Sequence, residues 1–139
     1  MPTLDTDDAR RRFAAARVAR LATVSGDGQP HVVPVVFAVE GDTVLIAVDH
    51  KPKRHRALKR LRNIGENAVV SLLVDHYDDD WDALWWVRAD GTATVSDAEP
   101  LLARARDALG VRYPQHRAEP PEGPAIVVEV TRWSGWSAS

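Results

Sequence analysis

Closely spaced strand signals limit the possible folds of this chain most strongly, because they require a core built on a sheet. Residues 18–24 alternate like a half-buried strand, and the glycine-rich segment 25–29 follows as a turn. Residues 31–39 are nearly all apolar, with Pro34 in the middle. Proline lacks the N–H that a central strand needs, so we expect an edge strand or a bulge there. Four further strands are expected at residues 43–48, 68–74, 83–95 and 125–133, the third with a bulge near Asp90 and Gly91.

Three helical segments are expected around these strands. Residues 6–17 begin at a capping residue, Asp5 or Thr6, and carry an apolar stripe. Residues 53–62 have apolar side chains at helical spacing, and residues 98–109 end at Gly110. Six mostly antiparallel strands with flanking helices predict an α+β protein of one domain, residues 1–139, built as a small barrel.

The composition excludes several classes of function. The chain contains no cysteine, which excludes disulfides, thiolate metal sites and cysteine nucleophiles. Its net charge is only −2, whereas a nucleic-acid-binding domain usually presents a broad basic face. No segment approaches the roughly 20 apolar residues of a membrane span, and none resembles a signal peptide. We therefore expect a cytoplasmic protein, and the preference for arginine over lysine fits a GC-rich bacterial genome.

Residues 51–62 form a basic run that contains all three lysines of a chain with fifteen arginines. The run opens with Lys51-Pro52-Lys53, directly after an apolar strand. Cations between a strand and a helix suit an anion, because free backbone N–H groups and the helix dipole add to their charge. The expected anion is a phosphate, which on a β-rich domain suggests a phosphorylated cofactor. The alternative is a solvated helix face.

Five tryptophans are many for a chain of this length: Trp81, Trp85, Trp86, Trp133 and Trp136. Neighbours on a strand face opposite ways, so Trp85 and Trp86 cannot both enter one barrel core. The one outside would pack in a dimer interface or under a helix, or would form the aromatic wall of a pocket for a flat ring. A role in the dimer interface and a role in the pocket wall are compatible if the pocket lies between two subunits.

The remaining candidate motifs are weak. The histidines show no metal-ligand spacing, and His55 fits a surface helix position. The acidic segment 75–82 lacks the spacing and the glycine of a calcium loop, which favours a solvated hairpin. The chain has no dinucleotide-binding, P-loop or serine-nucleophile motif. Chemistry in this protein would therefore have to come from a cofactor.

Five short motifs follow one another in a characteristic order. They are Leu21-Ala22-Thr23-Val24, Gly28-Gln29-Pro30-His31, Pro34-Val35-Val36-Phe37, Lys51-x-Lys53 and Val70-Ser71-Leu72-Leu73. In this order and spacing they resemble the split β-barrel family of pyridoxamine-phosphate-oxidase-like flavoproteins. The resemblance covers roughly residues 18–95, with the last strand through Trp133 also in place. The segment 49–53 and the Trp85-Trp86 pair are most similar to the actinobacterial branch that uses the deazaflavin coenzyme F-420.

The resemblance implies a six-stranded FMN-binding split barrel and a homodimer with the cofactor at the subunit interface. Residues implied to lie along the flavin-like ring and its ribityl chain are Val33, Pro34, Val35, Val36, Ile46, Ala47 and Val48. Lys51 and Lys53 would hold the phosphate, and Trp85 or Trp86 would face the ring. The arginines implied to meet the carboxylates of the F-420 oligoglutamate tail are Arg54, Arg56 and Arg60.

The expected function is that of an oxidoreductase that passes a hydride from reduced coenzyme F-420 to an electron-poor double bond of a small planar substrate. Positive charge beyond the two lysines suits the polyanionic tail, which FMN lacks. No catalytic residue is identified. The chain lacks the terminal Arg-x-His segment of true pyridoxamine phosphate oxidases, which argues against that reaction. Two alternatives stay open: an FMN-dependent oxidoreductase of the same fold, and a non-catalytic protein that binds or carries F-420 or a flavin.

Overall fold

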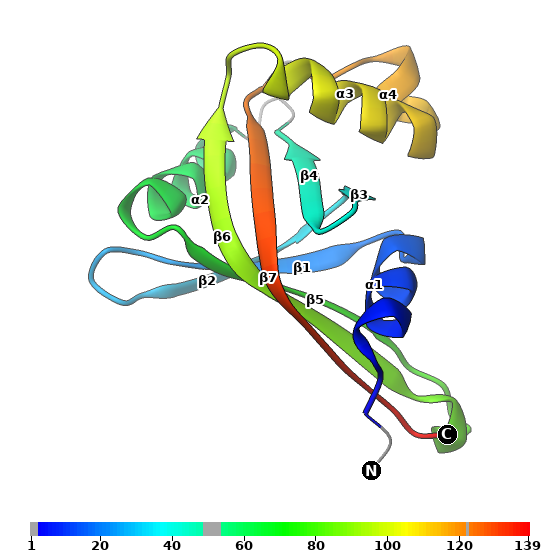
Figure 1. Ribbon diagram of the computed structural model, residues 1–139. Coiled ribbons are helices and arrows are strands. Elements are labelled where there is room, and N and C mark those ends of the chain that lie inside the picture. The colour runs from blue at the N-terminus through cyan, green and yellow to red at the C-terminus, as the bar shows by residue number, and fades with distance from the viewer. Residues whose placement is uncertain (1–2, 49–53, 122) are drawn as a thin grey trace.

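A computed structural model describes residues 3–48, 54–121 and 123–139 of the chain, with the backbone alone at residues 54–58. Its centre is one seven-stranded sheet in the order β2-β1-β5-β6-β7-β4-β3, and every neighbouring pair is antiparallel. The sheet curls strongly, so that the long antiparallel pair β6 and β7 crosses the molecule diagonally (Figure 1). The strands are β1 (Ala19–Val24), β2 (Pro30–Val35), β3 (Ala38–Glu40), β4 (Thr43–Ala47), β5 (Val69–His76), β6 (Trp85–Ser96) and β7 (Ala125–Ser137).

The helices lie around this sheet on different sides (Figure 1). Helix α1 begins after Asp5, whose carboxylate accepts from the Asp8 N–H at 2.8 Å, and it packs against β6 and β7. Helix α2 packs against β1 and β6, while α3 packs against β3, β4 and β7. The helices are α1 (Thr6–Ala15), α2 (Arg54–Glu66), α3 (Leu101–Arg112), α4 (Pro114–Ala118) and the 3₁₀ turn η1 (Trp81–Ala83). No helix in the described ranges is long and apolar enough to cross a membrane.

Two apolar clusters occupy opposite faces of β4, which explains why that strand reads as a continuous apolar run. Val44 and Ile46 belong to the cluster inside the barrel, where Phe13 of α1 is also fully buried. Leu45 and Ala47 belong to the cluster under α3. A strand that is covered on both faces needs no alternation of apolar and polar residues. Strand β4 is therefore a rigid element between two packed layers.

The expected α+β fold with an antiparallel sheet and flanking helices is confirmed, whereas the count of six strands is wrong. The apolar run 31–39 divides at residues 36 and 37 into β2, which pairs with β1, and β3, which pairs with β4. Pro34 lies on β2, an outer strand of the sheet, as its missing N–H predicts. The predicted bulge near Asp90 and Gly91 is confirmed by the register shift between β6 and β7.

Several boundaries also differ from those expected. Helix α2 continues to Glu66, α3 runs past Gly110 to Arg112, and strand β7 continues to Ser137. Helix α1 ends at Ala15 rather than at residue 17. Strand β5 continues to His76, inside the segment expected to be a loop. The proline-rich stretch contains the short helix α4, with Pro114 at its first turn, where a missing N–H costs no helical hydrogen bond.

Candidate functional site

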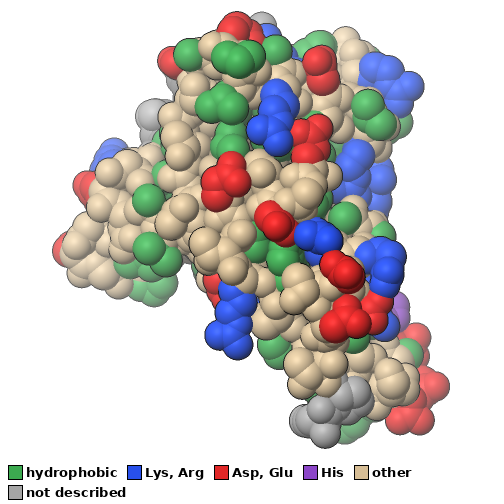
Figure 2. Space-filling model, viewed as in Figure 1, with side chains coloured by type: hydrophobic (Ala, Val, Ile, Leu, Met, Phe, Trp, Pro, Cys, Tyr) green, Lys and Arg blue, Asp and Glu red, His purple; other side chains and the backbone are tan. Residues whose placement is uncertain are grey.

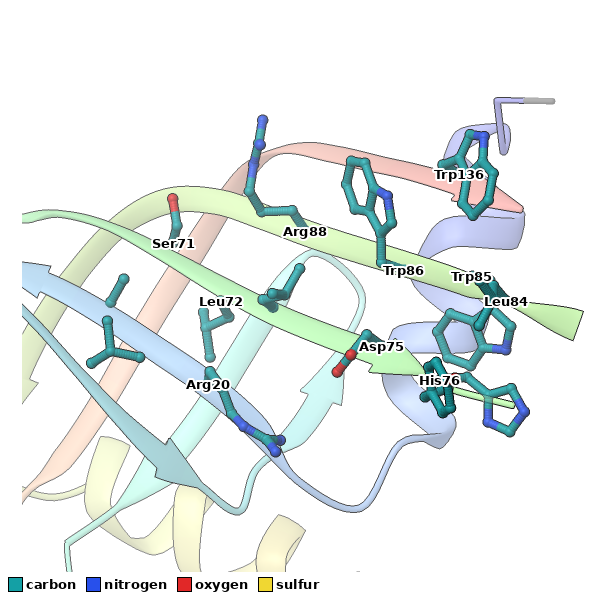
Figure 3. A pocket seen from close by; sticks show the side chains of 14 residues that line it. Arg20, Ser71, Leu72, Asp75, His76, Leu84, Trp85, Trp86, Arg88 and Trp136 are labelled. Carbon is teal, nitrogen blue, oxygen red and sulfur yellow. The ribbon is translucent and has the colours of Figure 1, made fainter. Parts of the chain in front are cut away.

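An open groove with a volume of about 730 Å³ runs across β1, β5 and β6 and ends at the β5–β6 connection (Figure 3). Its floor lies on the face of the sheet that points away from the barrel core. Strand alternation decides this placement, because Leu21, Leu72 and Ala89 are fully buried while their neighbours along each strand are exposed or half-buried. The aromatic residues that line the groove are His76, Tyr77, Trp85, Trp86 and Trp136.

The strand register places two arginines on either side of one exposed leucine. Leu73 of β5 pairs with Arg20 of β1 on one side and with Arg88 of β6 on the other. All three residues line the groove, and Leu73 is 40% exposed. Directly opposed residues of an antiparallel pair have Cβ atoms about 5 Å apart. The groove therefore has an apolar floor with a guanidinium on each side.

The two arginines differ in their partners. The Arg88 Nε donates to both carboxylate oxygens of Asp90 at 3.0 Å, and the Ser71 hydroxyl donates to the same carboxylate at 2.6 Å. Arg20 forms no ion pair with any residue that the structure describes. Its cross-strand neighbours, Pro34 and Leu73, are both apolar. Arg20 is thus the arginine of the groove that forms no ion pair with a described side chain.

Trp85 and Trp86 point to opposite sides of β6, as alternation predicts (Figure 3). Trp85 packs against the barrel core, with its ring stacked on His76 at 6.1 Å and the Arg12 guanidinium 5.4 Å from its centre. Trp86 lies on the outer face, opposite Trp136 of β7 and Asp75 of β5. The prediction that one of the two packs outside the barrel core is confirmed.

A second cationic region lies at helix α2, next to strand β2. The Arg60 side chain is half-buried, its Nε has no hydrogen-bond partner, and burial lowers the pKa of its guanidinium. The Nδ1 of His31 on β2 is likewise buried without a partner. Burial lowers the pKa of His31 first, and the charges of Lys59 and Arg60 add to this effect. A half-buried cation whose Nε has no acceptor has lost hydration, and an anionic ligand is one group that would replace it.

Comparison with known proteins identifies the family. The profile described as pyridoxamine 5'-phosphate oxidase matches residues 6–137. The chain belongs to this family. None of the curated proteins compared with the chain matches it significantly. The family assignment agrees with the antiparallel sheet and flanking helices described above.

Solved structures share the fold of this family member at low sequence identity. A conserved hypothetical protein from Mycobacterium tuberculosis is 20% identical, with a TM-score of 0.76, over 97% of this chain and 86% of that one. An FAD-binding protein from Mesorhizobium loti is 21% identical, with a TM-score of 0.75, over 96% and 95%. An FAD-binding protein from Mycobacterium smegmatis is 22% identical, with a TM-score of 0.68, over 97% and 98%.

The residues expected to contact a flavin-like cofactor occupy three different environments in this member of the family. Val33, Val35, Ile46 and Val48 pack in or against the barrel core, Val36 and Ala47 pack in the cluster under α3, and Pro34 is exposed. None of these seven lines the groove, which takes only Trp85 and Trp86 from the expected set. The expectation for their side chains is a prediction that nothing here tests.

The expected phosphate and tail ligands fall mainly outside the described side chains. Lys51 and Lys53 lie outside the described residues. Arg54 and Arg56 are in helix α2, where only the backbone is described, and Arg60 is the half-buried cation described above. The acidic segment has a structural role, because Asp78 and Asp80 accept from the N–H groups of Asp80 and Asp82 around η1. No group of three metal-ligating residues occurs in the part of the chain that the structure describes.

Sequence patterns do not indicate the charged residues of the groove, Arg20, Asp75 and Arg88. Arg20 and Arg88 read as solvent-facing positions of alternating strands and Asp75 as part of an acidic hairpin, so none of them signals a site on its own. A signal appears only in the register, because Arg20 and Arg88 lie 68 positions apart in the numbering and meet through Leu73. On the face shown in Figure 2, acidic and basic side chains are interspersed. That face therefore offers no broad basic surface of the kind that binds nucleic acid.

Proposed function

We propose that this protein is an oxidoreductase that binds a flavin-like cofactor, and that the cofactor is the deazaflavin coenzyme F-420. The match to the pyridoxamine 5'-phosphate oxidase family supports the flavin-related role. The observation that carries the choice of cofactor is the half-buried Arg60, which has no carboxylate partner among the described residues. A cation in this state suits a ligand with anionic groups beyond a single phosphate.

The residues near helix α2 fit such a group. Lys51 and Lys53 would hold its phosphate, and Arg54, Arg56 and Arg60 would meet the carboxylates of its tail. Charge-assisted hydrogen bonds of this kind contribute on the order of 1.5–3 kcal/mol each. Backbone groups from Val33 to Val36 and the strand from Ile46 to Val48 would position the ring, and Trp85 or Trp86 would cover it.

When bound and reduced, coenzyme F-420 would supply a hydride to an electron-poor double bond of a small planar acceptor. The protein would orient the acceptor in the groove, where Leu73 and Trp86 offer apolar surface. Its polar groups would set the direction of approach. The proposal assigns no side chain as the proton donor.

A homodimer with the cofactor at the subunit interface is part of the proposal. The outer face of the sheet exposes Val32 by 61%, Val69 by 63% and Leu73 by 40%. Apolar side chains gathered on one face of a sheet suit an interface with a second copy. Analytical ultracentrifugation would test this part, and a monomer at micromolar concentration would contradict it. A cytoplasmic location and an actinobacterial source complete the proposal.

Binding of ordinary flavins is the second candidate, since two proteins of the same fold are described as FAD-binding. A fluorescence titration of the purified protein with F-420, FMN and FAD at fixed ionic strength distinguishes the two. Tighter binding of F-420 supports the proposal, whereas tighter binding of FMN or FAD moves the protein to ordinary flavin chemistry. Tight F-420 binding without turnover across a broad acceptor panel would favour a carrier.

The double variant Lys51→Ala, Lys53→Ala tests the phosphate site within the same titration. We expect its affinity for F-420 to fall by at least tenfold, because two charge-assisted contacts are lost. The matched control is Arg104→Ala, which removes an exposed cation of helix α3 that pairs with Glu40. An F-420 affinity within twofold of the wild type in the double variant would show that these lysines do not hold the phosphate.

A further inference from the structure

We propose that the cleft between helices α3 and α4 binds the phosphate group of a small phosphate monoester. The two helices lie side by side at one end of the molecule (Figure 1). The cleft between them has a volume of about 750 Å³, and its polar side chains are Arg106 and Asp107 of α3 with His116 and Arg117 of α4. None of these residues lines the groove on the sheet, and none is assigned to the cofactor. The inference therefore stands apart from the proposed function.

The first step is the way in which backbone carbonyls hold the two arginines of the cleft. The Arg106 Nε donates to the Pro121 carbonyl at 2.8 Å, and the Arg117 Nε donates to the Gly110 carbonyl at 3.2 Å. Neither guanidinium makes another hydrogen bond to a residue that the structure describes. Each is thus fixed through its Nε and keeps its terminal amino groups for a ligand. A guanidinium held in this way loses less side-chain freedom when it binds.

The second step is that the carboxylates around the cleft do not use these donors. One Glu99 oxygen lies 3.7 Å from the Arg106 Nη1, beyond hydrogen-bond distance, and the other accepts from the Ala103 N–H at 2.9 Å. Asp107 is exposed, and neither it nor Arg117 forms an ion pair with any described residue. An oxyanion in the cleft would therefore gain charge-assisted hydrogen bonds without breaking any that the protein makes.

The third step is an additional donor on His116. Its Nδ1 is buried and has no hydrogen-bond partner, and its ring lies 5.7 Å from the Tyr113 ring. A buried polar atom without a partner costs free energy, which a ligand that bonds to it would recover. The Nδ1 donates in the tautomer that carries the proton on that atom. His116 thus adds a third side chain to the two arginines.

The number of donors and the size of the cleft favour a phosphate monoester. A carboxylate has two oxygens in one plane, which a single guanidinium satisfies, whereas a phosphate group offers three oxygens to donors on three side chains. The cleft leaves room beyond one phosphate group, and Val111, which is 82% exposed, and Pro120 add apolar surface to it. Asp107 would repel a second phosphate group. The expected ligand therefore carries one phosphate on a small organic group.

Amide NMR titrations of the full chain with phenyl phosphate, phenol and inorganic phosphate test this at fixed pH and ionic strength. We expect phenyl phosphate to shift the Gly110 and Val111 amide signals saturably and to bind at least fivefold more tightly than phenol, because the phosphate gains charge-assisted contacts. Inorganic phosphate should shift the same signals with lower affinity, since it lacks the apolar part. Equal affinity for inorganic phosphate would contradict the assignment of an ester.

Variants assign the binding to individual side chains. Arg117→Gln changes an exposed residue and should weaken phenyl phosphate binding about five- to tenfold. His116→Phe keeps a ring beside Tyr113 and should weaken binding about threefold, because one neutral donor is lost. Asp107→Asn should strengthen binding about twofold, because a repulsive charge is removed. The matched control is Arg104→Gln, an exposed arginine of the same helix that does not line the cleft, and it should bind as the wild type does.

Several outcomes would overturn the proposal. Absence of a saturable shift, equal affinity for phenyl phosphate and phenol, or an unchanged affinity in Arg117→Gln would each do so. The double variant Lys51→Ala, Lys53→Ala should keep the Gly110 and Val111 shifts, and their loss would assign the phosphate to the proposed cofactor site instead. If phenyl phosphate binds as expected while F-420 and the flavins do not, the cleft stands and the proposed function fails.

Discussion

The Tyr113 hydroxyl bonds to both backbone groups of Phe37. It accepts from the Phe37 N–H at 3.2 Å and donates to the Phe37 carbonyl, with 3.0 Å between the oxygens. Phe37 lies where the apolar run divides into β2 and β3, and neither strand provides a ladder partner for it. Tyr113, at the end of helix α3, therefore supplies hydrogen bonds to Phe37 that the sheet does not provide at this point.

Tyr113→Phe should lower the free energy of unfolding by about 1–3 kcal/mol, because it leaves the buried Phe37 N–H without its acceptor. Urea denaturation followed by tryptophan fluorescence measures this. The control is Tyr77→Phe, which alters an exposed tyrosine, 67% accessible, and should change the free energy of unfolding by less than about 0.5 kcal/mol. Equal effects of both substitutions would show that the Phe37 contact does not stabilise the fold.

Tyr113 also shows why part of the fold could not be predicted. The strand and helix positions follow from the periodicity of apolar residues, and the bulge at Gly91 and the edge position of Pro34 follow from their local chemistry. The division at Phe37 depends on a side chain 76 positions away, in a segment that resembles a proline-rich loop. A sequence pattern over a short window contains no information on such a long-range hydrogen bond, and the apolar run therefore predicts one strand where the structure has two.

The candidate site, like the fold, could be predicted only where local rules apply. Trp85 and Trp86 could be placed on opposite faces of β6 because alternation is a local rule. Arg20 and Leu73 could not be brought together, since their contact depends on the pairing of β1 with β5 across 53 positions. The basic character of helix α2 was visible in the sequence. The burial of Arg60 without a counter-ion was not, because it depends on how α2 packs against the sheet.

Gly91→Ala should destabilise the fold strongly, because a Cβ at this position would lie 2.2 Å from the backbone carbonyl oxygen of Glu129. Strands β6 and β7 would have to separate at the bulge, which we expect to cost several kcal/mol or to prevent folding. The control is Gly65→Ala near the end of α2, where nothing lies within 4 Å of an added Cβ. That variant should be as stable as the wild type or up to about 1 kcal/mol more stable. Thermal unfolding measures both, and a Gly91→Ala protein of wild-type stability would contradict the close approach.

The His31 imidazole should titrate below its ordinary pKa of 6.5, because it is desolvated and faces the cations Lys59 and Arg60. The unfolded chain then binds this proton more readily than the folded chain. The free energy of unfolding should therefore fall as the pH drops below about 6.5, and the cost is complete below the folded pKa. Proton NMR titration, with His31→Gln to assign the signal, measures the pKa directly. A His31 signal that titrates at or above 6.5 would contradict the burial of this group.

Arg60→Met should separate stability from cofactor binding, because Arg60 is a half-buried cation without a counter-ion. Methionine keeps the apolar stem and removes the charge, so the ligand-free protein should be equally stable or more stable by up to about 1 kcal/mol. If Arg60 meets an anionic group of the cofactor, the same change should weaken F-420 binding by about tenfold. The control is Arg62→Met, an exposed cation of the same helix, which should leave F-420 affinity within about twofold of the wild type. A loss of stability in Arg60→Met without a loss of affinity would instead make Arg60 a structural residue of the α2 interface, and the positive charge of this helix would no longer favour F-420 over FMN.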